Sequence, residues 1–299
     1  EMCIRDRRGE NTATVASQLA RLAGVPPRDV GYAGLKDRHA VTEQWFSVHL
    51  PGRSDPDWQT LDSGSITLLH STRHTRKLRR GALLGNAFRL RVRGLAGELD
   101  ALHERLQQVA AAGVPNYFGE QRFGLGGSNL VTAVRLFDGA SLRLSRHKRG
   151  LALSSARAFL FNRVLGLRVV DGSWNRLLPG EAVQLAGSHS FFAAGEVDAE
   201  LERRLREGDI HPSGPLAGRG DPPVSGECRQ LESDCLAPYA VMTRGLAAAG
   251  LKQERRALRV IARDMTWSWP VGDELLLEFS LPAGCYATSV LRELVQAGD

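Results

Sequence analysis

Residues 33–46 read AGLKDRHAVTEQWF and place a short polar loop between two apolar runs. The run at 30–33 and the apolar alternation at 44–50 are each typical of a β-strand. The loop at 36–42 therefore leaves the edge of a predicted sheet, and Asp37 is its acidic residue. This carboxylate is either a solvated turn residue or a reactive group, because a carboxylate can attack an anomeric carbon or remove a proton.

Outward from this loop, the sequence predicts a mixture of strands and helices. Further strands are expected at 66–69, 88–92 and 274–281, and helices at 12–23 (with Asn11 as N-cap), 98–112, 151–170, 200–206, 232–249 and 286–295. Residues 208–226 are rich in Gly and Pro and lack a period, which predicts a long surface loop. Because strands and helices do not alternate strictly, the predicted fold class is α+β rather than a doubly wound parallel sheet.

Length and composition narrow the class of protein. A chain of 299 residues favours two domains, or one domain with a large insertion. No run approaches the roughly 18 apolar residues of a membrane span, and no apolar secretory signal follows Glu1. The four cysteines are scattered without a C-x-x-C pair, so no metal site is expected. We expect a cytoplasmic protein without membrane contact.

Positive charge is concentrated in the first half of the chain. Residues 1–150 contain 23 Lys and Arg against 14 Asp and Glu, whereas the remainder contains 16 against 19. Much of the excess lies in one stretch, which comprises Arg73, His74, Arg76, Lys77, Arg79 and Arg80. Such a stretch can follow a phosphate backbone, although a solvated charge run has the same composition.

Three further segments combine aromatic and polar residues. In GNAF, residues 85–88, Asn86 offers groups for a base edge and Phe88 a face for stacking; a core Phe beside a turn Asn is the ordinary alternative. VPNYFGEQRFG, residues 114–124, suits either an RNA contact or a tightly built corner. LPAGCYATSVLREL, residues 281–294, predicts a strand end and a helix start, with Tyr286 facing the same cleft as Phe88 and Cys285 as a small hydrophobe.

Together the segments at 31–46, 81–88, 114–124 and 281–294 closely resemble the TruD family of tRNA pseudouridine synthases, in order from about residue 11 to the C-terminus. The resemblance implies an α+β fold. A catalytic pseudouridine synthase domain with a mixed, antiparallel sheet would comprise residues 1–111 and 261–299. A large inserted α+β TruD-type domain would occupy residues 112–260.

The resemblance also assigns roles to residues. It implies that Asp37 is catalytic and that Asn86, Phe88 and Tyr286 contact the substrate. RNA contacts are expected from Lys36, Arg38, His39, Arg73, Arg76, Lys77, Arg79, Arg80, Asn116, Phe118 and Arg122. The family pattern begins with a K-x-x-P-E-D-F-like segment that this sequence lacks, so an N-terminally truncated member is expected. Cys285 stands where serine is common, and Tyr286 where phenylalanine occurs.

The implied activity is conversion of a tRNA uridine, expected at position 13, to pseudouridine, without a metal or another cofactor and by a monomer. Asp37 would act as nucleophile at C1′ or as base at C2′. One alternative is a non-catalytic RNA-binding or RNA-chaperone protein, for which the charge, Phe88 and Phe118 suffice. A nucleoside N-glycosidase is the second alternative, since it also uses a carboxylate.

Overall fold

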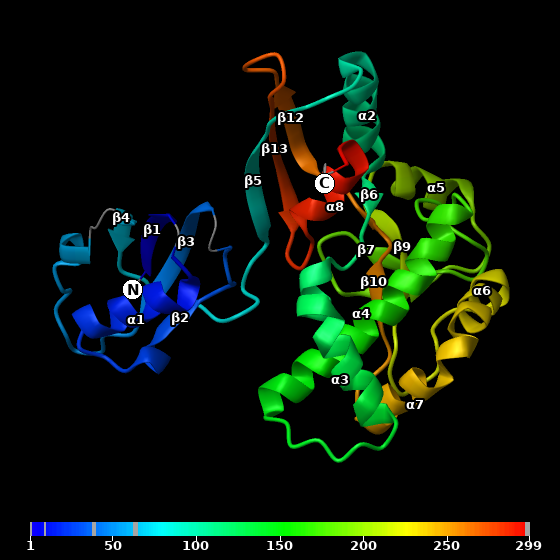
Figure 1. Cartoon of the computed structure of the whole chain (residues 1–299), viewed down its shortest axis with the longest axis horizontal. Coiled ribbons are helices and arrows are strands. Elements are labelled where there is room, and N and C mark those ends of the chain that lie inside the picture. The colour runs from blue at the N-terminus through cyan, green and yellow to red at the C-terminus, as the bar shows by residue number, and fades with distance from the viewer. Residues whose placement is uncertain (1, 9, 38–39, 62–64, 297–299) are drawn as a thin grey trace. The chain divides into compact units, whose positions relative to one another are not determined.

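The computed structural model describes residues 2–8, 10–37, 40–61 and 65–296, and it divides into two compact units, residues 1–84 and residues 85–299 (Figure 1). In the first unit, four strands form an antiparallel sheet in the order β2-β3-β1-β4. These strands are β1 (Met2–Arg8), β2 (Val30–Tyr32), β3 (Val41–Val48) and β4 (Ile66–Thr72). Two 3-10 helices, Pro27–Asp29 and Trp58–Leu61, lie in the connections.

Helix α1 (Thr12–Leu22) supplies much of the core of this unit. Its Val15 and Leu19 are buried together with Phe46 and Val48 of β3. The helix begins where the sequence predicts, because the Asn11 side chain accepts a hydrogen bond of 2.8 Å from the Thr14 amide. Strand β1 was not predicted. Its sequence MCIRDRR is highly charged, yet it pairs with β3 on one side and β4 on the other.

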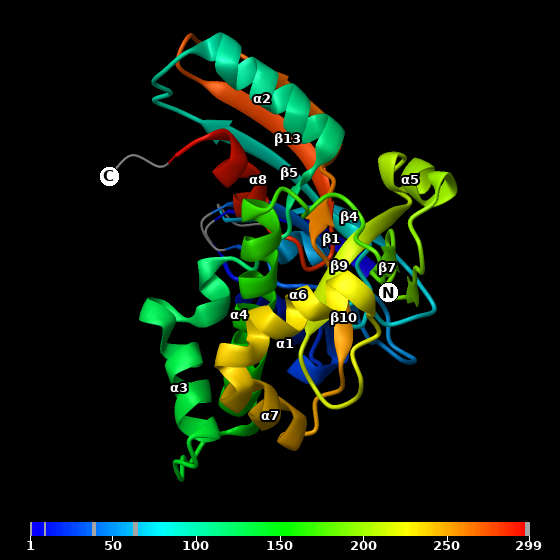
Figure 2. The same ribbon diagram turned by 90° about the vertical axis from the view of Figure 1, so that its right-hand side faces the viewer.

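The second unit contains a three-stranded antiparallel sheet in the order β12-β13-β5. The strands are β5 (Gly85–Val92), β12 (Arg263–Ser268) and β13 (Leu275–Pro282). Helices α2 (Leu99–Ala112) and α8 (Ala287–Leu294) pack on this sheet, and Figure 2 shows α2 running along it. The short strand β6 (Val114–Pro115) pairs with β11 (Arg259–Val260), where the chain leaves and re-enters this part of the unit.

The rest of the second unit surrounds a four-stranded antiparallel sheet in the order β10-β9-β7-β8. Its strands are β7 (Ala182–Leu185), β8 (Phe191–Ala193), β9 (Ile210–Leu216) and β10 (Glu254–Ala257). Its helices are α3 (Ser128–Phe137), α4 (Arg146–Val170), α5 (Ala199–Arg206), α6 (Gly226–Leu236) and α7 (Ala240–Ala248), with 3-10 helices at Glu120–Phe123, Leu125–Gly127 and Ala237–Tyr239. The predicted α+β class with antiparallel sheets is confirmed.

Two sequence predictions were wrong in this region. Residues 208–226 are not one surface loop, because they contain the buried strand β9 and only then a loop. Pro212 and Pro215 disguise the strand, since proline lacks an amide hydrogen and is rare inside sheets. Gly214 disguises it further, but a larger residue is disfavoured there because a Cβ would lie 2.8 Å from Leu258 Cδ2 and 3.0 Å from the ring of Phe161 on α4.

The helix predicted at 232–249 is in fact two helices. Helix α6 ends at Leu236, a 3-10 turn containing Pro238 follows, and α7 begins at Ala240. Proline interrupts the helix because it cannot donate the backbone hydrogen bond and its ring clashes with the preceding turn. In the part of the chain that the structure describes, no helix is long and apolar enough to cross a bilayer.

Candidate active site

The loop that carries Asp37 is held by two buried polar side chains of the first unit. The Thr12 hydroxyl accepts a hydrogen bond of 3.0 Å from the Lys36 amide, and it donates one of 3.3 Å to Gln44 Oε1. The Gln44 amide group in turn donates to the Gly34 carbonyl oxygen at 2.5 Å. Thr12 and Gln44 are only 1% and 8% exposed. The backbone before Asp37 is therefore fixed, whereas the Asp37 side chain is exposed.

Two of the predicted RNA contacts, Arg38 and His39, lie outside the described residues. Lys36 is half-buried and precedes Asp37 directly. Its backbone amide serves the structure of the loop, so the RNA-contact prediction concerns its side chain alone.

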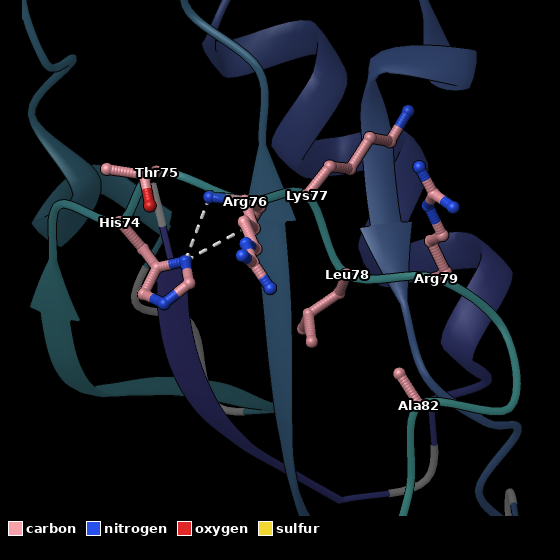
Figure 3. A pocket seen from close by; sticks show the side chains of 7 residues that line it. All are labelled: His74, Thr75, Arg76, Lys77, Leu78, Arg79 and Ala82. Atoms are coloured by element: carbon pink, nitrogen blue, oxygen red, sulfur yellow. Dashed lines mark hydrogen bonds between the residues drawn. The ribbon is translucent and has the colours of Figure 1, made fainter.

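The basic segment, residues 73–80, leaves β4 and crosses the first unit beside β2 and β3. The Leu78 amide donates to Ser47 Oγ at 2.9 Å, and the Gly81 amide donates to the Ala33 carbonyl at 2.9 Å. Residues of this segment line an open hollow of about 820 Å³. Figure 3 shows Lys77 and Arg79 on one side of the segment and Arg76 on the other.

The cations of the basic segment differ in their partners. Arg73 forms an ion pair with Asp55 at 3.2 Å, and Lys77 Nζ donates to the Arg28 carbonyl oxygen. Arg80 donates to the Tyr32 hydroxyl at 3.1 Å and lies 5.3 Å from the centre of that ring. Arg76 and Arg79 are exposed and form no ion pair with a carboxylate in the described parts of the chain. These two are the best placed to bind phosphate.

In the second unit, strand pairing brings two motifs to the same end of the β12-β13-β5 sheet. Asn86 is paired with Leu281 and Phe88 with Phe279, so the start of β5 lies beside the end of β13. The turn after β13 then leads to Tyr286, the residue before α8. Phe88 is half-buried and its ring stacks on Phe279, with ring centres 5.5 Å apart. Part of the Phe88 ring thus belongs to the core, which agrees with the alternative interpretation of GNAF as a core Phe beside a turn Asn.

The segment VPNYFGEQRFG forms a tightly built corner. Asn116 is 3% exposed, and its amide donates to the Ala257 carbonyl at 2.8 Å. The Phe118 backbone exchanges two hydrogen bonds with the Asn162 side chain, at 2.9 and 3.0 Å. The Phe118 ring meets Phe161 edge-on with centres 5.4 Å apart. The sequence left open an RNA contact or a tightly built corner, and the structure shows the corner. RNA contacts by Asn116 and Phe118 stay predictions.

Arg122 connects this corner to Tyr286. It donates to the Tyr286 hydroxyl at 2.9 Å and to Ser154 Oγ at 3.2 Å. Arg256, on β10, donates to Asn116 Oδ1 at 2.6 Å and to the Gly284 carbonyl at 3.1 Å. The sequence did not predict Arg256, because the run ERRA carries no motif that distinguishes this arginine.

Cys285 lies beside Arg256 and is half-buried. Burial raises the pKa of its thiol, and the nearby Arg256 opposes that rise only in part. A thiol with a raised pKa is a poor nucleophile at neutral pH, which agrees with the small hydrophobe expected from the sequence. No group of three or more candidate metal ligands occurs among the described residues.

The predicted site residues are thus divided between the two units. Asp37 and the basic segment belong to the first unit, and Asn86, Phe88, Asn116, Phe118, Arg122 and Tyr286 belong to the second. Within the second unit, Tyr286 and Arg122 are in direct contact, and Asn86 and Phe88 lie at the end of the sheet from which the chain continues to Tyr286.

Comparison with known proteins decides the family. The model of the family tRNA pseudouridine synthase D (TruD) matches residues 2–134 and 128–294. The chain belongs to the TruD family. A tRNA pseudouridine synthase D from Methylococcus capsulatus is 55% identical over 288 residues, which cover 96% of this chain and 81% of that protein. Its counterpart from Nitrosococcus oceani is 53% identical over 98% of this chain and 82% of its own length.

The TruD fold is also found in a solved structure. A crystal structure of a TruD protein from Methanosarcina mazei aligns with 99% of this chain and 88% of its own, with a TM-score of 0.70. The sequences are 19% identical, so this likeness concerns the fold alone.

Proposed function

We propose that this chain isomerises a uridine in tRNA to pseudouridine, the activity named for its TruD relatives. The observation that carries the proposal is the Asp37 loop, whose backbone is fixed by Thr12 and Gln44 while the carboxylate stays exposed. A preorganised backbone with an accessible carboxylate is what a reaction at a ribose carbon requires.

In the proposed reaction, the bond between N1 of uracil and C1′ breaks, the base turns, and C5 bonds to C1′. The C5 proton is released and N1 takes up a proton, so no electrons are gained or lost. Asp37 acts as nucleophile at C1′ or as base at C2′. Hydrolysis is the competing reaction, and it is suppressed when the site excludes water.

The target nucleotide must leave the folded RNA to reach such a site, which costs a few kcal/mol. Phe88 and Tyr286 are proposed to receive the base, with Asn86 at its edge. Stacking on an aromatic side chain contributes about 1–3 kcal/mol per base. The half-buried ring of Phe88, held on Phe279, suits this role because its orientation is already fixed.

The basic segment is proposed to hold the tRNA body, with Arg76 and Arg79 as its main phosphate ligands. Both are exposed in the described structure, and phosphate neutralisation by arginine gives a salt-sensitive affinity. The expected specificity is position 13 of tRNA, and the protein is proposed to act as a monomer in the cytoplasm.

We also propose the discontinuous catalytic domain, residues 1–111 and 261–299, around a TruD insertion at 112–260. One core supports the return of the last segment to the region before the insertion. That core contains Leu106 and Val109 from before the insertion and Leu275, Leu277, Phe279 and Val290 from after it.

Incubating the chain with unmodified tRNA transcripts and mapping pseudouridine tests the proposal. Formation at one uridine is expected. Binding without any product would favour the non-catalytic RNA-binding alternative, and release of free uracil would favour the N-glycosidase.

A further inference from the structure

Two arginines of the second unit lie at Tyr286 without a carboxylate partner. Arg256 donates to the Asn116 side-chain oxygen and the Gly284 carbonyl, both neutral groups. Arg122 donates to two hydroxyls, those of Ser154 and Tyr286. Neither forms an ion pair with any carboxylate that the structure describes.

Two fully buried arginines of the same unit have carboxylate partners. Arg168 is 1% exposed and pairs with Glu181 at 3.1 Å. Arg255, the direct neighbour of Arg256, is 3% exposed and pairs with Glu232 at 2.7 Å. Arg259 is 6% exposed and has no carboxylate partner among the described residues, but its guanidinium donates to His211 Nδ1 and the Leu205 carbonyl. Arg122 and Arg256 differ from all three, because the Nε–H of each has no partner in the described chain.

Both guanidinium groups lie against the same aromatic ring, that of Phe118. They lie 5.4 Å (Arg122) and 4.1 Å (Arg256) from the centre of the Phe118 ring. The Nε atoms of both are buried and have no hydrogen-bond partner in the described chain. Burial lowers the pKa of Arg256, Cys285 and Tyr286 oppose that fall in part, and the charge of Arg122 adds to it.

Both side chains are half-buried. An anion that binds them would lower their free energy, because a cation removed from water without a counter-charge is poorly compensated. Each guanidinium still has an N–H group without a partner in the described chain, at Nε. A guanidinium edge donates two parallel hydrogen bonds, which match the oxygens of a phosphate.

We propose that Arg122 and Arg256 form a binding site for a backbone phosphodiester of the RNA, beside the nucleotide that contacts Tyr286. The choice of RNA as the source of the phosphate rests on the proposed function. The hydrogen bond between Arg122 and the Tyr286 hydroxyl links the two contacts, so phosphate binding also positions the ring that receives the base.

Salt-dependent binding of tRNA by the full chain tests the site. Arg122→Gln and Arg256→Gln are compared with Arg203→Gln, which removes the same charge from the exposed helix α5. For Arg122→Gln and Arg256→Gln we expect tRNA affinity to fall three- to tenfold. The plot of the logarithm of the association constant against the logarithm of the salt concentration should become less steep by about 1 unit of slope. Arg203→Gln should change neither. Site variants with wild-type slopes would overturn the proposal.

Two further measurements, with Arg256→Lys and with an altered RNA, distinguish loss of a phosphate contact from a folding defect. Arg256→Lys keeps the charge, so it should keep the salt slope even if its melting temperature falls. A neutral methylphosphonate placed next to the target uridine should weaken binding by the wild-type chain. Arg256→Gln should bind the methylphosphonate RNA as tightly as it binds the unmodified RNA. Equal losses for both proteins at every phosphate would contradict the proposed site.

Free phosphate is the other source of the same anion. Two results together would show that free phosphate, and not RNA, occupies the site. Inorganic phosphate would stabilise the wild-type chain but not Arg256→Gln, and the salt dependence of tRNA binding would be the same for both proteins. These measurements read affinity and not product. An inactive wild-type chain would therefore contradict the proposed function and leave the salt slopes to decide the phosphate site.

Discussion

The Thr12 hydroxyl accepts a hydrogen bond of 3.0 Å from the backbone amide of Lys36, 24 residues further along the chain. Thr12 is the first residue of α1, and Lys36 directly precedes Asp37. A helix start thus supports the loop with the proposed catalytic carboxylate. A displacement of about 1 Å in a catalytic group can cost up to 100-fold in rate.

Thr12→Val keeps the shape of the side chain and removes the acceptor, which leaves the Lys36 amide without this partner. We expect kcat for pseudouridine formation to fall at least tenfold with little change in KM. Thr12→Ser should restore most of the rate. Ser17→Ala, which removes an exposed hydroxyl from the same helix, serves as the control. A Thr12→Val enzyme with wild-type kcat would refute the positioning role.

Asp37→Asn should abolish turnover while tRNA affinity stays within a small factor, because the amide keeps the volume but cannot act as nucleophile or base. Tritium release from 5-tritiated uridine in tRNA measures the reaction, and filter binding measures affinity. Normal tritium release by the variant would exclude Asp37 as the catalytic group.

Phe88→Leu should slow single-turnover formation of pseudouridine, since stacking with the base is lost while apolar contact with Phe279 is retained. The loss of about 1–3 kcal/mol corresponds to roughly five- to 150-fold. Phe191→Leu, at an exposed ring on β8, is the matched control. Equal single-turnover rates for both variants would argue against a substrate contact by Phe88.

His211 should make folding stability depend on pH. Burial lowers the pKa of its imidazole to about 4, with further lowering by Arg259 and Arg263 and a small opposing effect of Asp209. Its Nδ1 accepts a hydrogen bond of 3.3 Å from Arg259, which requires the neutral ring.

Below about pH 6.5 the unfolded chain binds a proton at this position that the folded chain does not bind until pH reaches about 4. The contribution of His211 to the free energy of unfolding is therefore fully present above pH 6.5. It declines as the pH falls, by about 3 kcal/mol in total. Urea unfolding of wild type and His211→Asn from pH 7 to pH 4 measures this. An identical pH slope in both proteins would rule the effect out.

Glu181→Gln should destabilise the second unit by about 3–5 kcal/mol, because it leaves the buried Arg168 without its counter-charge. The Glu181 carboxylate also accepts hydrogen bonds of 3.1 Å from the Leu178 and Ser213 amides. Glu200→Gln, in an exposed ion pair with Arg203, should leave the urea midpoint unchanged. Similar midpoints for the two variants would contradict the prediction.

Local sequence patterns predicted the elements whose signals are local. The Asn11 cap, the apolar face of α1 and the alternation of β5 each depend on residues within one or two turns or strand repeats. β9 could not be predicted in this way. Its glycine packs against Phe161, a residue that only the fold brings near.

The sequence by itself determined the family, the α+β class and the identity of the motif residues, because these depend on residue types at fixed spacing. The tertiary structure decided which side chains meet. Arg256 reaches Asn116 across 140 residues of chain, and Thr12 supports a loop beyond its own helix. Such contacts are set by packing between distant segments, which local propensity does not encode. The uncompensated charge beside Tyr286 therefore became visible only in the folded chain.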